Sequence, residues 1–209
     1  PLIIDLPLLG YEVYVDLVDF NVEQTNAVTQ CDMLGYFYYK PYTDVSKRQA
    51  KSIDQNRVRA YYGSSQHFLK SFADNRLVEN GYTLTMSSMI VKGKKNIPTS
   101  LPVDVKEYSE SKGNLIRIHG LKDKNLKIKY YHRSDDSPVN FAENSKGIRR
   151  YSESGITFLE DDCSFSREGI VRDNSIRFTG DISKRRVAAS LPDDYVPPVD
   201  SSRVRPAES

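Results

Sequence analysis

The chain has 209 residues, enough for one large domain with a sizeable core, or for one domain and a tail. Its 30 basic and 28 acidic residues give a formal net charge of +2 and are interleaved along the chain. This pattern disfavours nucleic-acid binding, for which Lys and Arg gather on one face or along one helix. No apolar run approaches the roughly 20 residues that a membrane-spanning helix needs.

The first 42 residues alternate polar and apolar side chains, as strands with one buried face do, and the chain's fourteen Tyr favour strands further. The alternation is clearest from Tyr11 to Leu17. Asn21–Gln24 is suited to a turn, Thr25–Gln30 and Leu34–Tyr42 to further strands, and Gly35 to a bulge or bend. We therefore expect an antiparallel meander of two to four strands.

A helical period replaces this alternation after Thr43. Asp44 or Ser46 is suited to cap a helix, and Val45–Tyr62 contains no Gly or Pro. The apolar stripe of this segment is thin, so the helix is expected to be largely exposed. Its solvated residues would be Lys47, Arg48, Lys51, Arg57 and Arg59. Of these, Lys47, Arg48, Lys51 and Arg57 are candidates for contact with a partner.

A second, amphipathic helix is predicted from Ser65 to Leu77, with its stop at Asn80-Gly81. Gly63 would either end the first helix in a left-handed conformation or bend it, and Ser64 or Ser65 would cap the second. The predicted structural motif at this junction comprises Tyr61, Tyr62, Gly63, Ser64, His67, Phe68 and Leu69.

The rest of the chain again favours strands, at Tyr82–Val91, up to Gly120, at Leu126–Tyr131, at 156–159 and in short pieces towards Phe178. Pro98 and Pro102 make 96–112 a loop or an edge segment. Residues 133–147 are expected to form a polar loop and Ile182–Ser190 one or two helical turns.

These elements predict an α+β fold. Its main part would be an antiparallel sheet with meander connections, which forms either a partly open barrel or a sandwich. One helical segment would be inserted near residues 44–80. Residues 1–192 would form a single domain, and the Pro- and Ser-rich residues 193–209 an extended C-terminal arm. The arm, with Tyr195, Pro197 and Pro198, is a second candidate for partner contact.

No catalytic, cofactor-binding or metal-binding residue is predicted. His67, His119 and His132 lack the spacing of a helical zinc motif, and the acidic run Glu160–Asp162 does not fit a calcium loop. The widely separated Cys31 and Cys163 are compatible with two free thiols or with a single disulfide.

The segment Arg59–Tyr82, RAYYGSSQHFLKSFADNRLVENGY, resembles a region found in Bacteroidetes cell-envelope proteins that carry a carboxypeptidase-regulatory-like domain. Leu9-Gly10-Tyr11 is similar to the start of that region, and Leu34–Phe37 to its second motif, with Phe37 where proline is usual. Arg186–Pro197 is similar to its close. Ser65-Gln66 and Gly180-Asp181 depart from the family pattern.

The resemblance implies export and a periplasmic or outer-membrane location, with the signal sequence and a preceding β-sandwich domain upstream of Pro1. It implies no enzymatic activity, because the region is of unknown function. Our first hypothesis is a non-enzymatic accessory domain that binds another envelope protein, such as an outer-membrane barrel or its assembly partners. The alternatives are a glycan-binding or glycan-processing module that uses Tyr-rich strands, and a structural spacer.

Overall fold

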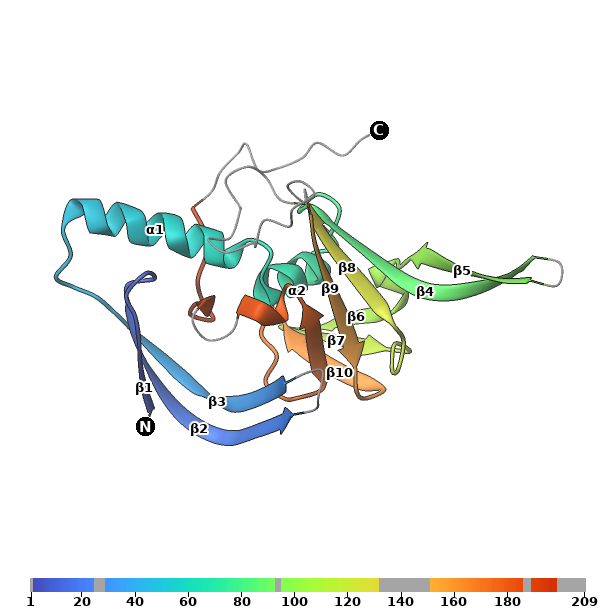
Figure 1. Cartoon of the computed structure of the whole chain (residues 1–209), viewed down its shortest axis with the longest axis horizontal. Coiled ribbons are helices and arrows are strands. Elements are labelled where there is room, and N and C mark those ends of the chain that lie inside the picture. The colour runs from blue at the N-terminus through green and yellow to red at the C-terminus, as the bar shows by residue number, and fades with distance from the viewer. Residues whose placement is uncertain (1, 25–28, 93–94, 132–150, 186–188, 199–209) are drawn as a thin grey trace.

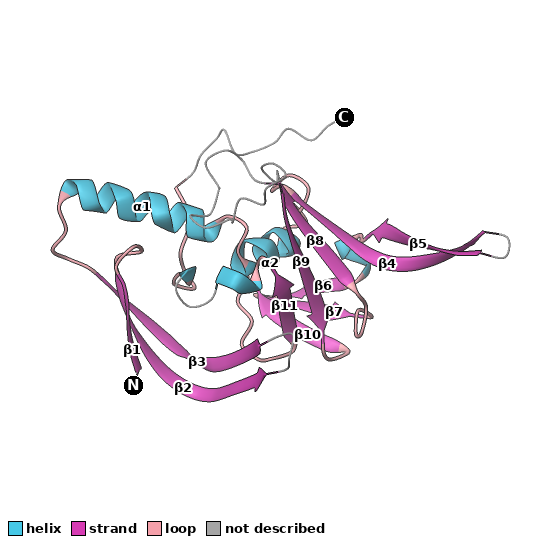
Figure 2. Ribbon diagram, viewed as in Figure 1, coloured by secondary structure: helices cyan, strands magenta, loops and turns pink. Residues whose placement is uncertain are grey.

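The computed structural model describes residues 2–24, 29–92, 95–131, 151–185 and 189–198. Within this part the chain forms antiparallel sheets and two α-helices, which confirms the mainly antiparallel α+β fold (Figure 2). The strands are β1 Leu2–Leu6, β2 Tyr11–Gln24, β3 Thr29–Pro41, β4 Tyr82–Lys92, β5 Lys95–Pro102, β6 Ser109–Lys112, β7 Leu115–His119, β8 Leu126–Tyr131, β9 Tyr151–Phe158, β10 Asp162–Ser166 and β11 Ile176–Gly180. The helices are α1 Lys47–Tyr61 and α2 Ser65–Ala73, with 3-10 turns η1 at Val105–Glu107 and η2 at Ser183–Arg185.

The first sheet is the expected meander, in the order β1-β2-β3. Its register shifts between Leu17, opposite Gly35, and Asp19, opposite Leu34, which leaves Val18 as a bulge. A Cβ on Gly35 would stand 2.7 Å from the carbonyl oxygen of Asp16, so only glycine fits opposite the bulge. The predicted turn at Asn21–Gln24 is wrong, because these residues pair with β3 and ladder pairing outweighs their turn preference.

The predicted caps at the starts of the two helices and the junction at Gly63 are confirmed. Ser46 and Gln49 form a reciprocal capping box at the start of α1, and the Ser64 hydroxyl accepts from the amide of His67 at the start of α2. Gly63 adopts the left-handed conformation, with φ +77°, between the two helices.

The second helix is shorter than the sequence suggests. Asn75 takes a left-handed φ of +53°, and its amide and that of Arg76 donate to the carbonyls of Phe72 and Ser71. This is a Schellman ending with Asn in place of Gly, which stops α2 at Ala73 rather than at Asn80-Gly81. Leu77 is still buried, in the turn that follows.

The remaining strands form a five-stranded sheet, β11-β9-β8-β4-β5, and a three-stranded sheet, β10-β7-β6. The predicted half-buried strand is β8, whose residues alternate between buried and more exposed positions. Residues 96–112 were predicted to be a loop or an edge segment, and the proline-containing β5 does lie at the edge of its sheet. Strand β6, in the same stretch, was not predicted. Residues 132–150, which include His132 and the predicted polar loop, lie outside the described part of the chain.

Two buried clusters divide the interior. The larger cluster joins the inner faces of the second and third sheets to Phe68, Leu69 and Phe72 of α2. The smaller cluster joins the β1–β3 meander to the end of α1 and to Leu191. Tyr62 packs against both clusters, so the helix junction couples the two parts of the fold (Figure 1). Cys163 is buried in the larger cluster as a free thiol, and the side chain of Cys31 lies outside the described residues.

Candidate functional site

The start of the meander is fastened to α1 by Arg57. Its Nε and Nη2 donate to the carbonyls of Leu9 and Gly10 at 2.8 and 3.3 Å, and its guanidinium lies 4.1 Å from the centre of the Tyr11 ring. The Arg57 side chain is only 19% exposed, and it forms a long ion pair with Asp54 at 4.0 Å. The sequence suggested Arg57 for partner contact, but in the structure its guanidinium donates to carbonyl groups of the same chain.

His67 lies in the middle of an aromatic cage at the helix junction. The centre of its ring lies 5.0 to 5.8 Å from the ring centres of Tyr61, Tyr62, Tyr82 and Tyr130. The amide of Gly63 donates to Nδ1 at 3.2 Å, and the Tyr82 hydroxyl lies 2.9 Å from the same atom. Because a backbone amide only donates, Nδ1 is unprotonated and His67 is neutral in this arrangement. The predicted structural histidine is therefore held by its own local partners.

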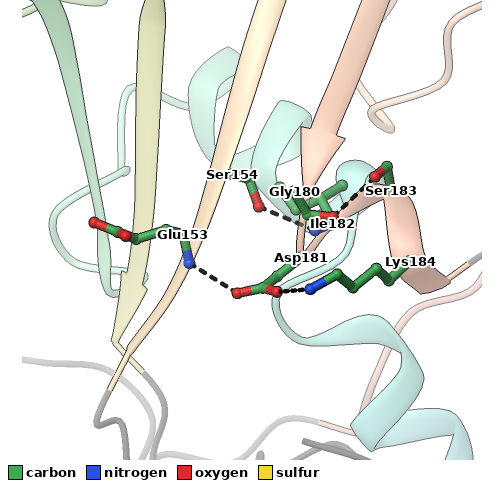
Figure 3. Close-up of polar contacts among 7 residues, drawn as sticks. All are labelled: Glu153, Ser154, Gly180, Asp181, Ile182, Ser183 and Lys184. Atoms are coloured by element: carbon green, nitrogen blue, oxygen red, sulfur yellow. Dashed lines mark hydrogen bonds and ion pairs between the residues drawn. The ribbon is translucent and has the colours of Figure 1, made fainter. Parts of the chain in front are cut away.

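The segment that leads to the C-terminal arm is fixed by a compact polar corner (Figure 3). Asp181 accepts from the amide of Glu153 at 3.0 Å and from Lys184 Nζ at 2.8 Å, and Ser154 Oγ accepts from the amide of Ile182 at 2.9 Å. These contacts tie the end of β11 to β9 and set the position of η2.

Arg185, at the end of η2, then caps the first helix. Its Nη1 donates to the carbonyls of Arg59 and Ala60 at 3.2 and 2.8 Å. Carbonyls at a helix C-terminus lack helical partners and carry partial negative charge, so a guanidinium there stabilises the helix. Arg185 therefore fastens η2 to the end of α1.

The described part of the arm, up to Pro198, packs on its own chain. Leu191 is buried in the smaller cluster, the ring centres of Tyr195 and Tyr61 are 5.8 Å apart, and Gln66 Nε2 donates to the Asp193 carbonyl at 3.0 Å. Burial raises the pKa of Tyr195 to about 12 and that of Tyr61 further, and it also raises the pKa of the Asp193 carboxyl. Residues 186–188 and 199–209 of the predicted closing motif and arm lie outside the described residues.

This packing brings together three segments that are far apart in the sequence. Leu9-Gly10-Tyr11, the helix junction at Tyr61–His67, and Leu191–Tyr195 all contribute to the same small cluster or contact it. Each of them lies in or next to a segment on which the family resemblance rests, the other such segment being Leu34–Phe37. Their common role in this structure is to close the meander, the helices and the arm onto one another.

A shallow groove of about 650 Å³ runs along the outer face of α1 and ends at Pro198. It is lined by one stripe of the helix, opposite the buried Ile53 and Ala60, together with the arm. The lining residues are Lys47, Ala50, Lys51, Asp54, Gln55, Val58, Arg59 and Pro198. Among the described residues, the groove has three cations, one carboxylate and an apolar floor, which suit it to an acidic ligand with some apolar surface.

The predicted contact residues are only partly brought together. Lys47, Lys51 and Pro198 meet in the groove, while Arg48 is exposed without lining it, and Tyr195 and Pro197 are partly buried. Sequence reasoning missed Gln55, Val58 and the groove role of Arg59. The signal was present as helical spacing, because positions 47, 51, 54, 55 and 58 share one face of a helix.

A second candidate surface is the outer face of the meander. Tyr36 and Tyr38 of β3 are exposed, Tyr38 lies beside Tyr14 with ring centres 6.2 Å apart, and Asp16 pairs opposite Tyr36. By contrast, Phe37 and Tyr39 point to the other face and pack against the smaller cluster. The Tyr-rich run predicted from the sequence is thus half core and half surface.

Among the described residues, no group of three or more His, Cys, Asp and Glu side chains is arranged to hold a metal ion. In the same part of the chain, neither helix has the length and apolar character needed to cross a bilayer. Comparisons with protein-family models, curated proteins and solved structures found no match to this chain.

Proposed function

We propose that this chain is a non-enzymatic binding domain that recognises an acidic segment of another protein in the groove on α1. The observation that carries the proposal is the convergence of Lys47, Lys51 and Arg59 with Pro198, which the arm delivers from the far end of the chain. The two sides of the groove, α1 and the arm, are already fixed by contacts of Arg57, Arg185 and Tyr195. Binding therefore loses less conformational entropy than it would in a groove with mobile sides.

We further propose that the partner is a cell-envelope protein, such as an outer-membrane barrel or one of its assembly partners, and that the domain resides in the periplasm or at the outer membrane. The family resemblance supports this location. In the same proposal the five- and three-stranded sheets form a partly open sandwich that carries the meander and helices as the recognition part. The shared interior of these two sheets supports this view.

The test is site-specific photocrosslinking from Gln55, which lines the groove, in intact cells of a Bacteroidetes bacterium that produces the protein. The matched control places the same crosslinker at Lys124, which is exposed on the opposite part of the fold. A discrete adduct from position 55 that disappears in the Lys47→Glu/Lys51→Glu variant supports the proposal. An adduct that survives this charge reversal, or equal labelling from position 124, contradicts it.

A glycan-binding module is the second candidate, because Tyr36 and Tyr38 are exposed and the carboxylate of Asp16 lies opposite Tyr36 in the sheet. Exposed aromatic rings offer a stacking surface for sugar rings, and neighbouring carboxylates offer hydrogen-bond acceptors. Isothermal titration with soluble peptidoglycan fragments and with cellohexaose tests this candidate. Binding that is lost in Tyr36→Ala/Tyr38→Ala supports it, and the absence of heat with both ligands rejects it.

A further inference from the structure

The outer face of the five-stranded sheet is a further candidate surface (Figure 2). The inner residues of β4, β8 and β9 belong to the larger cluster, so the alternate residues of these strands point away from the core. Each residue of the outer face is at least partly exposed, so no other described element covers it. The residues are Thr83, Thr85, Lys127, Lys129, Tyr131, Tyr151, Glu153, Gly155, Thr157, Arg177 and Thr179.

Cations outnumber acids on this face. Its cations are Lys127, Lys129 and Arg177, and the only carboxylate among its described residues is that of Glu153. Lys129 pairs with Glu153 at 3.5 Å, and its ammonium lies 4.8 Å from the centre of the Tyr151 ring. Lys127 is fully on the surface, and no acid in the described part of the chain forms an ion pair with it. The face therefore has a net positive charge.

One row across the strands combines a cation with hydroxyl groups. Thr85, Lys127, Gly155 and Thr179 are successive partners on β4, β8, β9 and β11. Thr179 Oγ1 lies 2.5 Å from the position that a Cβ on residue 155 would take, so only glycine fits beside it. The row thus presents an ammonium group between two hydroxyl groups and has no bulky apolar side chain.

Two tyrosines lie at one end of the same face. Tyr131 and Tyr151 are opposite each other in the pairing of β8 with β9, and their ring centres are 5.7 Å apart. Lys129 lies over one side of the Tyr151 ring, whereas Tyr131 is 36% exposed. An exposed tyrosine ring offers an apolar surface on which a sugar ring packs, with a polar hydroxyl at its tip.

These groups suit an acidic polysaccharide better than other polyanions. A peptide gains affinity for a sheet by main-chain pairing, but β4, β8 and β9 each have a neighbouring strand on both sides. Single-stranded nucleic acid stacks its bases on aromatic rings along a positively charged groove, whereas here the tyrosines lie at one end and Glu153 interrupts the positive charge. Sugar hydroxyls, by contrast, bond to threonine hydroxyls and donate to a carboxylate.

We propose that the outer face of β4, β8, β9 and β11 binds a polysaccharide of uronic acids. The carboxylates of the polysaccharide pair with Lys127 and Lys129. Its hydroxyl groups bond to Thr85 and Thr179, and one sugar ring stacks on Tyr131. This site goes beyond the proposed recognition of an acidic protein segment in the groove on α1 and does not rest on it, because the two surfaces share no residue.

Isothermal titration calorimetry of the full chain with hexagalacturonate and with a mannuronate hexamer measures the binding. We expect saturable binding that weakens as the salt concentration rises, since salt screens pairs of exposed charges. In amide NMR spectra, the shift changes at saturation should be confined to β4, β8, β9 and β11.

Three variants test the residues in the proposal. Lys127→Glu/Lys129→Glu should bind about tenfold more weakly, since exposed charge pairs contribute about threefold each. Tyr131→Ala should bind about threefold more weakly, because it removes the stacking surface. Glu153→Gln removes the one described carboxylate of the face and releases Lys129, so it should bind about threefold more tightly. A damaged fold does not produce such a gain.

Two controls make the same charge change elsewhere. Lys106→Glu/Lys112→Glu alters exposed positions on η1 and β6 and should bind like the parent chain. Lys47→Glu/Lys51→Glu should also bind like the parent chain, which separates this site from the groove. The absence of heat with both uronate hexamers, or an equal loss in either control, would overturn the proposal. Binding of hexaglutamate or of hexathymidylate as tight as that of hexagalacturonate would also overturn it, because the face would then recognise negative charge without sugar.

Discussion

Replacement of His67 by Phe tests whether the helix junction depends on a hydrogen bond or only on ring packing. Phe fills a similar volume among the same tyrosines but has no acceptor for the amide of Gly63, which donates to Nδ1 at 3.2 Å. Both residues are buried, so water is a poor substitute for the lost acceptor. Loss of a buried partner costs about 1–3 kcal/mol, and we expect the free energy of unfolding to fall by about 2 kcal/mol.

Urea denaturation followed by circular dichroism measures this loss. With a slope of about 2 kcal/mol per molar urea, the expected midpoint is about 1 M lower than that of the parent chain. The matched control is His119→Phe, at the exposed end of β7, which should change stability by less than about 0.5 kcal/mol. If His67→Phe is as stable as that control, packing alone holds the junction and the proposed role of Nδ1 is wrong.

Three further changes test other parts of the same argument. Ser46→Ala removes the capping box of α1 and should cost about 1 kcal/mol, measured by urea denaturation, with Ser52→Ala on the same helix as the control. Arg57→Met keeps the apolar stem but loses the donors to Leu9 and Gly10; a cost of about 2 kcal/mol and faster hydrogen exchange in residues 6–12 are expected. Burial raises the pKa of Tyr195 from 10.0 to about 12, so the folded state keeps this proton longer than the unfolded state. Stability contributed by this group is complete below about pH 10 and is lost as the pH rises towards 12, and Tyr195→Phe should make the pH dependence in that window less steep. If stability falls with pH equally steeply in Tyr195→Phe, a group other than Tyr195 causes the loss of stability at alkaline pH.

Local signals in the sequence predicted much of the fold. Ser46 is one of the two residues suited to cap the first helix, Gly63 stands where a left-handed residue ends a helix, and the alternation of Leu126–Tyr131 specifies a half-buried strand. Each of these features depends on residues within one or two turns of each other. Propensity and periodicity carry such information directly.

The features that were missed depend on distant partners. Asn21–Gln24 has turn composition but is held extended by pairing with β3. In the sequence, Arg57 is a charged residue on the polar side of a helix, which is typical of a solvated position. Only the fold shows that the carbonyls of Leu9 and Gly10 lie within its reach. The groove likewise requires Pro198 to return to α1, which no local pattern indicates.

The placement of charge on α1 provides one more argument for the groove. The first turn of the helix contains Lys47 and Arg48 and no acid. Free amides at a helix N-terminus carry partial positive charge, so cations there reduce stability by about 0.3–1 kcal/mol each, and stability alone would favour acids. The proposed recognition of an acidic partner gives Lys47, which lines the groove, a role that helix stability does not.

Lys47→Glu separates these two explanations in a single variant. Reversal of this charge should raise the free energy of unfolding by about 0.5–1 kcal/mol, because the carboxylate now interacts favourably with the helix dipole. The same change should weaken the crosslink from Gln55, since Lys47 lines the groove. Gln49→Glu is unsuitable as a control because it alters the capping box, so Ser52→Glu, on the same helix but outside the groove lining, serves instead. A variant that is both more stable and fully able to form the crosslink would show that Lys47 has no part in recognition.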